Sequence, residues 1–297
     1  MNLSDFGLLI KTLRRTTVDR QGVPWTRESL SSAVHLSPDQ LGRLERGDRK
    51  YLDTQTLLHL ADSFNLTNLE RKEFLYAALG LSNETLFPRE DSLTRFNNLL
   101  AEMNVFQVPA LLLDAYADIV AANTSTLNLF MVTPELLNYA KQIPAGQNLL
   151  YLIYEPAFGT REIFGPSWRK IATIEILLFR RSTLRYRHTA YFKSLLGILL
   201  KERQFDIDWY FCQKYADRYD LTYFHFQYDH PRYGPLSYMA TETLVSTRQG
   251  DLYLLLYNPV DTTTASVFKN LKGQGENNVY RFAGWPDKKT PPARKEN

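Results

Sequence analysis

Apolar residues in the first eighty positions recur every three or four residues, which is the spacing of one face of an α-helix. Ser37 before Pro38 marks a helix start, because proline at the first helical position loses no hydrogen bond, and Gly47 marks a stop. The pattern predicts five helices, over residues 4–21, 26–34, 38–46, 54–64 and 67–79. Five short helices predict a compact all-α domain over residues 1–81.

The polar stretch 82–92, which contains Pro88, is expected to be a linker, because the pattern changes after it. Apolar runs of strand length lie at both ends of the following region, and a helical tract over about 161–219 lies between them. The predicted strands are 108–114, 117–120, 221–228, 234–247 and 251–257, and shorter helices are expected over 123–130 and 136–141. This order predicts an α+β domain with an antiparallel sheet over residues 93–271, followed by a disordered tail over 272–297.

The stretch from Thr26 to Gly47 meets the requirements of a helix-turn-helix. Ala33 and Val34 fill the inner face of its first helix, and an apolar residue, Leu36, follows the turn at His35. The run from Leu41 to Gly47 also resembles the end of the Cro/C1 (xenobiotic-response-element) family motif, apolar-x-x-apolar-Glu-x-Gly. His35 departs from that family, which usually has a left-handed glycine there.

A recognition helix over residues 38–46 would lie in the major groove with its N-terminal side chains against base edges. Geometry and the resemblance together predict base contacts from Asp39, Gln40 and Arg43: aspartate accepts from cytosine, glutamine pairs with adenine and arginine pairs with guanine. The resemblance implies that Arg27 contacts a phosphate, and Arg46, Arg49 and Lys50 are expected to do likewise. Solvated surface charge is the alternative reading of these basic residues.

Charge and aromatic residues are unevenly distributed. The net charge of +3 separates into +3 for residues 1–50, −3 for residues 51–271 and +3 for residues 272–297. A weakly basic first domain favours salt-sensitive DNA binding that needs two copies, and hence a homodimer on an inverted-repeat operator. Of the 39 aromatic residues, 23 fall within residues 149–257, which is more than an ordinary core needs. Either a second layer of helices or a cavity has to take up this surplus.

Four short stretches of the second domain, in this order and behind a Cro/C1-type first domain, resemble the MmyB-like transcription regulators. They are the stretch 109–114 leading to 121–123, the stretch 147–154 followed by Trp168, the pair Phe205 and Trp209, and the stretch 230–236. The resemblance implies a PAS-like domain with helices on one side of an antiparallel sheet and an apolar cavity. It also implies a fatty acid or similar apolar molecule as ligand. Arg232-Tyr233 after His-Pro departs from the family, which commonly has an acidic or small residue there.

Aromatic and basic side chains of the helical tract are the candidate pocket residues. Tyrosine and tryptophan suit a pocket for an apolar ligand with one polar end. The basic run from Arg180 to Lys193 could supply an anchor for a carboxylate, although such a run is more often a solvated helix face. The predicted pocket residues are Phe179, Arg180, Tyr191, Phe192, Trp209 and Tyr215.

An enzyme is not expected, because the sequence has no glycine-rich phosphate loop, no nucleophile elbow and no metal-spaced set of His and Cys. His225 and His230 would point to opposite faces of a strand, and His230 is expected to be a turn or core histidine. The single cysteine, Cys212, fits a reducing compartment and is expected to be a core residue rather than a redox sensor. Without a signal peptide or an apolar run of membrane-spanning length, the expected location is the cytoplasm.

The sequence therefore predicts a transcriptional regulator that binds operator DNA as a dimer and senses a small apolar ligand, with no metal or other cofactor. The alternatives are a ligand-independent repressor whose second domain only dimerises, and a protein whose second domain binds a protein partner.

Overall fold

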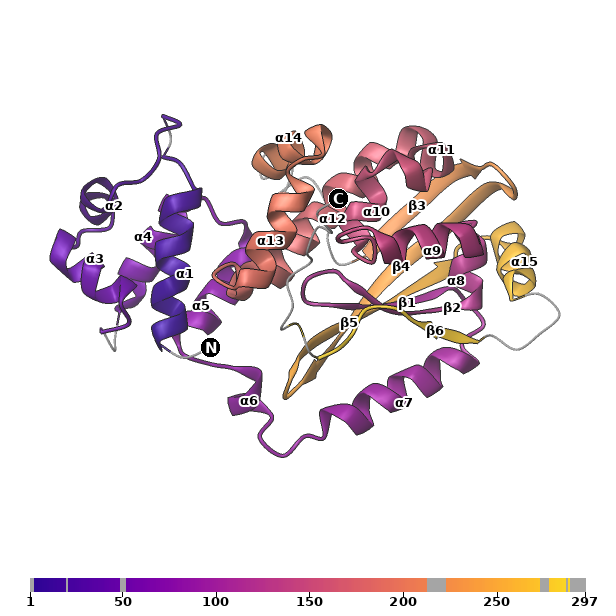
Figure 1. Cartoon of the computed structure of the whole chain (residues 1–297), viewed down its shortest axis with the longest axis horizontal. Coiled ribbons are helices and arrows are strands. Elements are labelled where there is room, and N and C mark those ends of the chain that lie inside the picture. The colour runs from indigo at the N-terminus through magenta and orange to yellow at the C-terminus, as the bar shows by residue number, and fades with distance from the viewer. Residues whose placement is uncertain are drawn as a thin grey trace.

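The computed structural model describes residues 3–19, 21–48, 52–212, 223–272, 278–286 and 288. Two regions lie side by side in it (Figure 1): a bundle of helices α1–α5, and a larger region in which helices cover a sheet. This arrangement confirms the prediction of an all-helical region followed by an α+β domain with an antiparallel sheet. Among the described helices, none is long and apolar enough to cross a membrane.

The first domain follows the predicted order of helices closely. Side chains at the predicted caps accept hydrogen bonds from the first turns: Thr26 caps α2, Ser37 caps α3 and Thr67 caps α5. A Cβ at Gly7 would lie 2.5 Å from the carbonyl oxygen of Leu44, so α1 crosses the end of α3 at a separation that needs glycine. The helices are α1 (Leu3–Thr16), α2 (Arg27–Ala33), α3 (Pro38–Glu45), α4 (Thr54–Ser63) and α5 (Asn68–Ala78).

The described strands of the second domain form one antiparallel sheet in the order β3-β4-β5-β1-β2-β6. Hairpin turns join β1 to β2, β3 to β4 and β4 to β5, whereas the helices lie between β2 and β3 in the sequence. The strands are β1 (Ala110–Asp114), β2 (Ile119–Asn123), β3 (Tyr223–His230), β4 (Gly234–Thr247), β5 (Gly250–Pro259) and β6 (Val279–Arg281).

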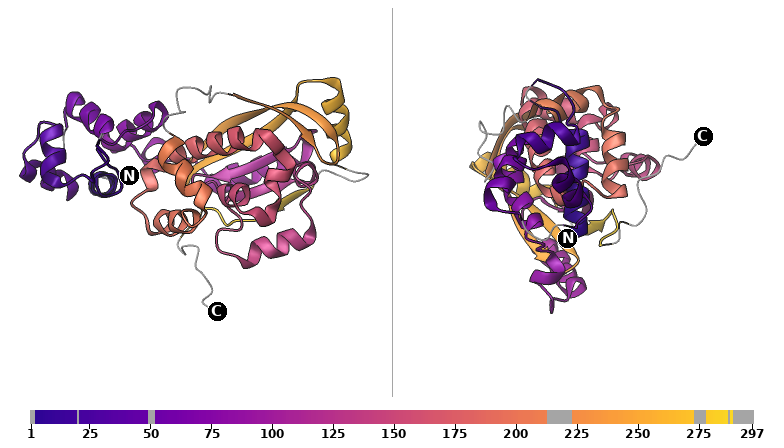
Figure 2. Two further views of the ribbon diagram at one scale, coloured as in Figure 1. Left: turned by 90° about the horizontal axis from the view of Figure 1, so that it is seen from above. Right: turned by 90° about the vertical axis from the view of Figure 1, so that its left-hand side faces the viewer.

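Helices cover both faces of the sheet (Figures 1 and 2). Helix α7 (Ser92–Val105) packs on one face through Phe96 and Met103, which meet Leu112. A larger group of helices packs on the other face, where Leu111 and Leu113 join the main core. All five residues of β1 are buried, because alternate side chains of this strand enter two different cores.

The helices of this larger group and their short connections are α8 (Thr124–Leu129), α9 (Pro134–Gln142), α10 (Leu149–Tyr154), η1 (Pro156–Phe158), α11 (Thr160–Phe164), η2 (Gly165–Ser167), α12 (Trp168–Thr183), η3 (Leu184–Tyr186), α13 (Ala190–Leu199) and α14 (Arg203–Phe211). The predicted helical tract is thus a series of helices with turns at several points. Two further helices lie outside this run in the sequence: α6 (Asn83–Leu86) comes before α7, and α15 (Thr262–Leu271) comes after β5 and packs on α8.

Part of the predicted disordered tail is ordered, which corrects the sequence-based expectation for residues 278–286 and 288. Strand β6 pairs with β2, and the backbone N–H groups of Phe282 and Ala283 donate to carbonyls of Val120 and Ile119, each at 2.9 Å. The expectation failed because the sheet, a partner distant in sequence, supplies the hydrogen bonds that order this short segment. The rest of the tail, except Lys272, lies outside the described residues.

The two domains share apolar contacts. Leu184, in η3 of the second domain, is fully buried in the core of the first domain, together with residues such as Phe6 and Phe74. Contacts between the domains run mainly through α5 and α1 on one side and through η3 and α12 on the other. Helix α12 therefore reaches from the core of the second domain to the surface of the first.

Candidate functional site

Two places in the structure have the features of a binding site: the surface of α2 and α3 in the first domain, and a cavity in the second. In the first domain, a tight turn at His35 joins α2 to α3, and His35 has a φ of 57°. The left-handed conformation inferred for this residue is therefore present without glycine, at some steric cost. The ring of His35 contacts that of His59 on α4, with centroids 5.1 Å apart.

Asp39, Gln40 and Arg43 are all exposed on α3. Gln40 already has a role in the fold, because its Oε1 accepts a hydrogen bond from the backbone N–H of Ser37 at 2.8 Å, while the Ser37 hydroxyl caps Gln40. In this conformation the amide N–H₂ of Gln40 remains free to donate, but the bidentate pairing with adenine expected from the sequence would require the cap to open.

Glu45 is buried at the centre of the first domain's charged contacts. Its carboxylate binds Arg14 of α1 at 2.5 Å and Arg27 of α2 at 2.9 Å. Burial alone would raise the pKa of Glu45, but the hydrogen bonds from both arginines outweigh it and hold the pKa below its usual value. Sequence analysis did not find this role, although Glu45 is the glutamate of the motif on which the Cro/C1 resemblance rests.

The residues predicted to contact phosphates differ in whether their guanidinium groups are already paired within the protein. The guanidinium of Arg27 lies against Glu45, although its side chain stays 43% exposed. Arg46 is exposed and pairs with Asp48 at 2.8 Å. Arg49 and Lys50 lie outside the described residues. Arg27 thus differs from the expectation of a free surface charge, because Glu45 neutralises part of its charge.

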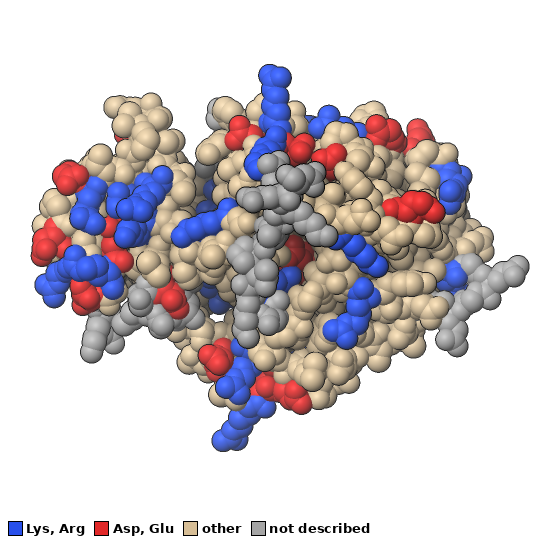
Figure 3. Space-filling view, viewed as in Figure 1, with Lys and Arg blue, Asp and Glu red and all other residues tan. Residues whose placement is uncertain are grey.

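The surface formed by α2 and α3 faces away from the second domain (Figures 1 and 2). Figure 3 shows lysine and arginine side chains gathered over the first domain, with acidic side chains among them. Since the domains contact each other mainly through α1 and α5, the second domain leaves this surface open to a large partner.

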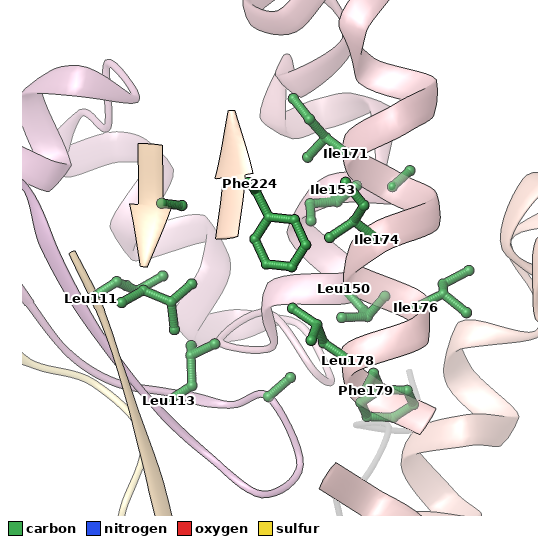
Figure 4. Packing of buried hydrophobic residues seen from close by; sticks show 14 of the residues in the cluster. Leu111, Leu113, Leu150, Ile153, Ile171, Ile174, Ile176, Leu178, Phe179 and Phe224 are labelled. Carbon is green, nitrogen blue, oxygen red and sulfur yellow. The ribbon is translucent and has the colours of Figure 1, made fainter. Parts of the chain in front are cut away.

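The second site is a cavity of about 140 Å³ between the sheet and helices α8–α12. Figure 4 shows one side of this packing, in which Leu111 of β1 and Ile171 of α12 extend toward the space between sheet and helix. An apolar cavity of this size can stay dry and hold an apolar molecule. Its lining includes Leu111, Ile119, Ala122, Leu127, Phe130, Leu149, Leu152, Ile153, Phe158, Phe164, Ile171, Phe226, Tyr238, Tyr257 and Phe282.

The polar side chains at this cavity fall into two groups. Three are already engaged: the Thr126 hydroxyl donates to the Ala110 carbonyl at 2.8 Å, the Thr160 hydroxyl donates to the Ile153 carbonyl at 2.8 Å, and the Tyr238 hydroxyl shares a 3.1 Å hydrogen bond with that of Tyr228. Glu175 is 8% exposed, and Lys141 is exposed at the rim. Burial, with a smaller contribution from Glu242, raises the pKa of Glu175 to about 8. Glu175 therefore presents an uncharged carboxyl group at neutral pH, at a position between this cavity and a smaller adjoining space that Arg181 and Glu242 also line.

None of the described residues predicted for the pocket lines this cavity. Phe179, Phe192 and Trp209 pack against one another, with centroids about 6 Å apart. The Tyr191 hydroxyl donates to Asp118. Tyr215 lies outside the described residues. The aromatic surplus showed that the region needed extra packing volume but not which side chains face the empty space, and most lining residues come from β1, β2 and α8–α11.

Arg180, the remaining pocket prediction, lies at the domain interface instead. It binds the fully buried Glu70 of α5 at 3.1 Å, and Arg187 binds the same carboxylate. Burial opposes ionisation of Glu70, but the two guanidinium groups and the Thr67 backbone N–H lower its pKa to about 2. The ring of Trp209 lies 5.0 Å from the Arg180 guanidinium.

Other arginines of the same run are also paired. Arg185 binds Glu73 of α5 and Asp251 of β5, each at 2.9 Å, and Arg181 binds Glu242 at 2.5 Å. The run was expected to be either a solvated face or a ligand anchor. It binds carboxylates of the protein itself, two of which, Glu70 and Glu73, belong to the first domain.

The remaining candidate residues have structural roles. Cys212 is buried, and burial raises the pKa of its thiol to about 11, which makes it unreactive at neutral pH. His230 is also buried, with its Nε2 2.8 Å from the Leu129 carbonyl oxygen. Within the described ranges, no group of three or more His, Cys, Asp and Glu side chains could hold a metal ion.

Comparison with known proteins identifies the second domain. Residues 94–271 match the family model of the MmyB-like transcription regulator ligand binding domain. No curated protein matches the chain. The family match spans the sheet strands β1–β5 and all the helices that surround the cavity.

Proposed function

The chain belongs to the MmyB-like transcription regulators, a family of regulators and not of enzymes, and we propose that it binds operator DNA through α2 and α3 while its second domain senses a small apolar molecule. One observation carries the proposal. A single helix, α12, lines the ligand-domain cavity through Ile171 and Glu175 and binds the first domain through Arg180. The proposal places the protein in the cytoplasm, with the DNA.

For DNA, α3 is the recognition helix, and its surface is free of the second domain. Asp39, Gln40 and Arg43 read base edges, with Gln40 acting as a donor while its cap is closed. The phosphates are contacted by Arg27, Arg46, Arg49 and Lys50. Exposure of the guanidinium groups of Arg43 and Arg46 supports this docking.

A dimer follows from the weak charge of the first domain. With only +3 in its first fifty residues, one copy would bind DNA weakly and lose affinity steeply with salt. Two copies on an inverted repeat would place their recognition helices about one helical turn apart, roughly 34 Å.

For the ligand, we propose a PAS-like domain that takes a fatty acid or a similar apolar molecule. The apolar cavity between the antiparallel sheet and the larger group of helices supports this proposal, whereas α7 on the other face departs from the expected arrangement with helices on one side only. Exposed Lys141 at the rim is the charged group that could meet a carboxylate.

Ligand binding would act on DNA binding through α12. Occupancy of the cavity shifts α12 between two positions, and Arg180 of α12, together with Arg185 of η3, transmits the shift to α5 of the first domain. The separation of the two recognition helices in the dimer then changes. Constant operator affinity while ligand is added or stripped would contradict this coupling.

The DNA proposal is tested by selecting bound sequences from a random duplex library with the full chain, followed by footprinting. The expected result is an inverted repeat with both half-sites protected, and loss of base preference at one position in Arg43→Ala. Arg95→Ala, an exposed arginine on α7, is the matched control and should bind like the wild type. Unchanged affinity and preference in Arg43→Ala would rule out this docking.

Native mass spectrometry separates the proposal from its rival, a regulator whose second domain only dimerises or binds a protein partner. Extra mass that survives desalting supports a bound ligand. Its absence, with the dimer intact, favours the rival.

A further inference from the structure

The cavity has one end that is more polar than the rest, formed by Glu175 of α12 and Tyr257 of β5. Both side chains line the cavity, and both residues are more than nine-tenths buried. The Glu175 carboxyl acts on Tyr257, because after burial itself it is the largest cause of the raised Tyr257 pKa. Since Lys141 is exposed at the rim and Glu175 is buried, this polar pair marks the inner end.

Neither group has a hydrogen-bond partner in the part of the chain that the structure describes. Across the described residues, no hydrogen bond or ion pair reaches the Glu175 carboxyl or the Tyr257 hydroxyl. The nearest candidate cation, Arg181, is occupied: it binds Glu242 at 2.5 Å and its guanidinium lies 5.4 Å from the Tyr253 ring centroid. Buried polar groups are nearly always paired, so an unpaired pair facing a cavity points to a ligand.

The protonation of Glu175 decides which ligand group fits. Burial and the neighbouring Glu242 raise its pKa to about 8, so its carboxyl carries a proton at neutral pH. The inner end of the cavity therefore presents two O–H donors. Two O–H donors in one cavity match an oxygen that has two lone pairs and no proton of its own.

We propose that the inner end of the cavity holds the carbonyl oxygen of an uncharged apolar molecule, such as a long-chain ketone or ester, through O–H donation from Glu175 and Tyr257. The inference rests on the proposed ligand-sensing function and specifies its ligand class. It differs from a fatty acid held by its carboxylate.

A carboxylate does not fit this end. It would lie beside Glu175 and near Glu242, and Arg181, the cation that acts on Glu175 among the described residues, is already paired with Glu242. A fatty acid could place its carboxylate only at the rim beside Lys141. Its methyl end would then face Glu175 and leave both O–H groups without an acceptor, which is a cost comparable to a lost hydrogen bond.

The test measures binding of four twelve-carbon probes to the full chain: 2-dodecanone, dodecanoic acid, dodecylamine and dodecane. Displacement of a fluorescent apolar dye gives each affinity at about pH 6.5 and about pH 9.5, on either side of the Glu175 pKa of about 8. We expect 2-dodecanone to bind tightest at the lower pH and to weaken about tenfold at the higher pH, as one donor is lost.

Substitutions at Glu175 and Tyr257 distinguish the contribution of hydrogen bonds to ligand affinity from that of apolar packing. Glu175→Leu and Tyr257→Phe should each weaken 2-dodecanone about tenfold while leaving dodecane unchanged or tighter. Glu175→Gln keeps an N–H donor, so it should retain ketone binding without the pH dependence.

Three results would overturn the proposal. Tightest binding of dodecanoic acid, lost in Lys141→Gln, would place a carboxylate at the rim. Tightest binding of dodecylamine would show that Glu175 ionises to pair with a cation. Ketone affinity that is unaffected by Glu175→Leu and by pH would show that the pair does not contact the ligand. Gel shifts with operator DNA measure DNA binding independently of the ligand assay. Each of these three results would therefore reject the ligand class without rejecting the proposed regulator function.

Discussion

Arg180 of α12 and Glu70 of α5 form a buried ion pair between the two domains, with the Arg180 Nε 3.1 Å from the Glu70 Oε1. Arg187 completes the site on the same carboxylate, and the Arg180 guanidinium also donates to the Trp209 carbonyl at 3.1 Å. Removing one member of a fully buried set of charges strongly destabilises a protein, because the remaining members stay charged and unpaired. The pair therefore fixes the position of the first domain relative to α12.

Replacing Glu70 by glutamine should lower the free energy of unfolding by about 3 kcal/mol, because two buried arginines lose their counter-charge. Urea unfolding of the full chain measures this value. Glu84→Gln is the matched control, since the side chain of Glu84 is 72% exposed and lies 3.7 Å from Arg248; it should change stability by less than about 0.5 kcal/mol. Equal effects of the two substitutions would contradict the importance of the buried pair.

Acid should weaken the same interface. The Glu70 pKa is about 2 in the folded chain against an ordinary value of 4.5, so its contribution is complete above about pH 4.5 and is lost as the pH falls toward 2. Thermal unfolding followed from pH 5 to pH 2 should show this loss in the wild type. In Glu70→Gln the corresponding part of the pH dependence should be missing, and an identical profile in both proteins would show that Glu70 is not its source.

The raised pKa of Glu175 predicts that stability depends on pH in the opposite direction. Its folded pKa of about 8 lies above the ordinary 4.5, so stability is complete below about pH 4.5 and declines as the pH rises through 8. Glu175→Gln should remove this decline and stabilise the unliganded protein at pH 9 by up to about 5 kcal/mol, since one pKa unit corresponds to about 1.4 kcal/mol. Melting temperatures at pH 6 and pH 9 check this prediction, and a variant that loses stability equally at both would refute it.

Arg43→Ala should weaken operator binding by about 1–3 kcal/mol and remove the preference at one base pair, because a guanidinium bidentate to guanine discriminates by that amount. Binding to the selected operator and to its single-base variants measures both effects. Arg95→Ala, on α7, provides the comparison, and a uniform loss across all sequences in Arg43→Ala would indicate a phosphate contact instead.

Filling the cavity should abolish ligand binding without unfolding the domain. Leu152 lines the cavity and is only partly buried, so Leu152→Trp adds volume where the side chain has some freedom to adjust. The affinity for a fluorescent apolar dye should fall by at least about tenfold in Leu152→Trp. Leu93→Trp, at a 60% exposed position on α7, should leave this affinity unchanged. Undiminished dye binding in Leu152→Trp would place the ligand elsewhere.

Local signals in the sequence were sufficient for the first domain. The caps at Thr26, Ser37 and Thr67 involve residues three positions apart, and the structure places α2, α3 and α5 directly after them. The left-handed conformation of His35 is the one that the Cro/C1 resemblance implies for this position.

The features that could not be predicted from the sequence depend on contacts between residues far apart in the chain. The carboxylate partner of Arg180 lies 110 positions away in the sequence, so nothing near Arg180 indicates whether it meets solvent, ligand or protein. The cavity posed the same problem, because Ala122, Leu152 and Phe226 give no local sign that they surround one space. Glu175 had a usable signal: it is a single acid among apolar residues of a helix that is buried over most of its length.

Burial of Leu184 in the core of the first domain has a consequence for how the protein is made. The first domain leaves the ribosome first, but one of its core positions is filled by a residue synthesised about a hundred positions later. Its core stays incomplete until about half of the second domain has been translated. A nascent or truncated chain that ends before Leu184 therefore lacks one apolar side chain of the core on which α1 and α5 pack.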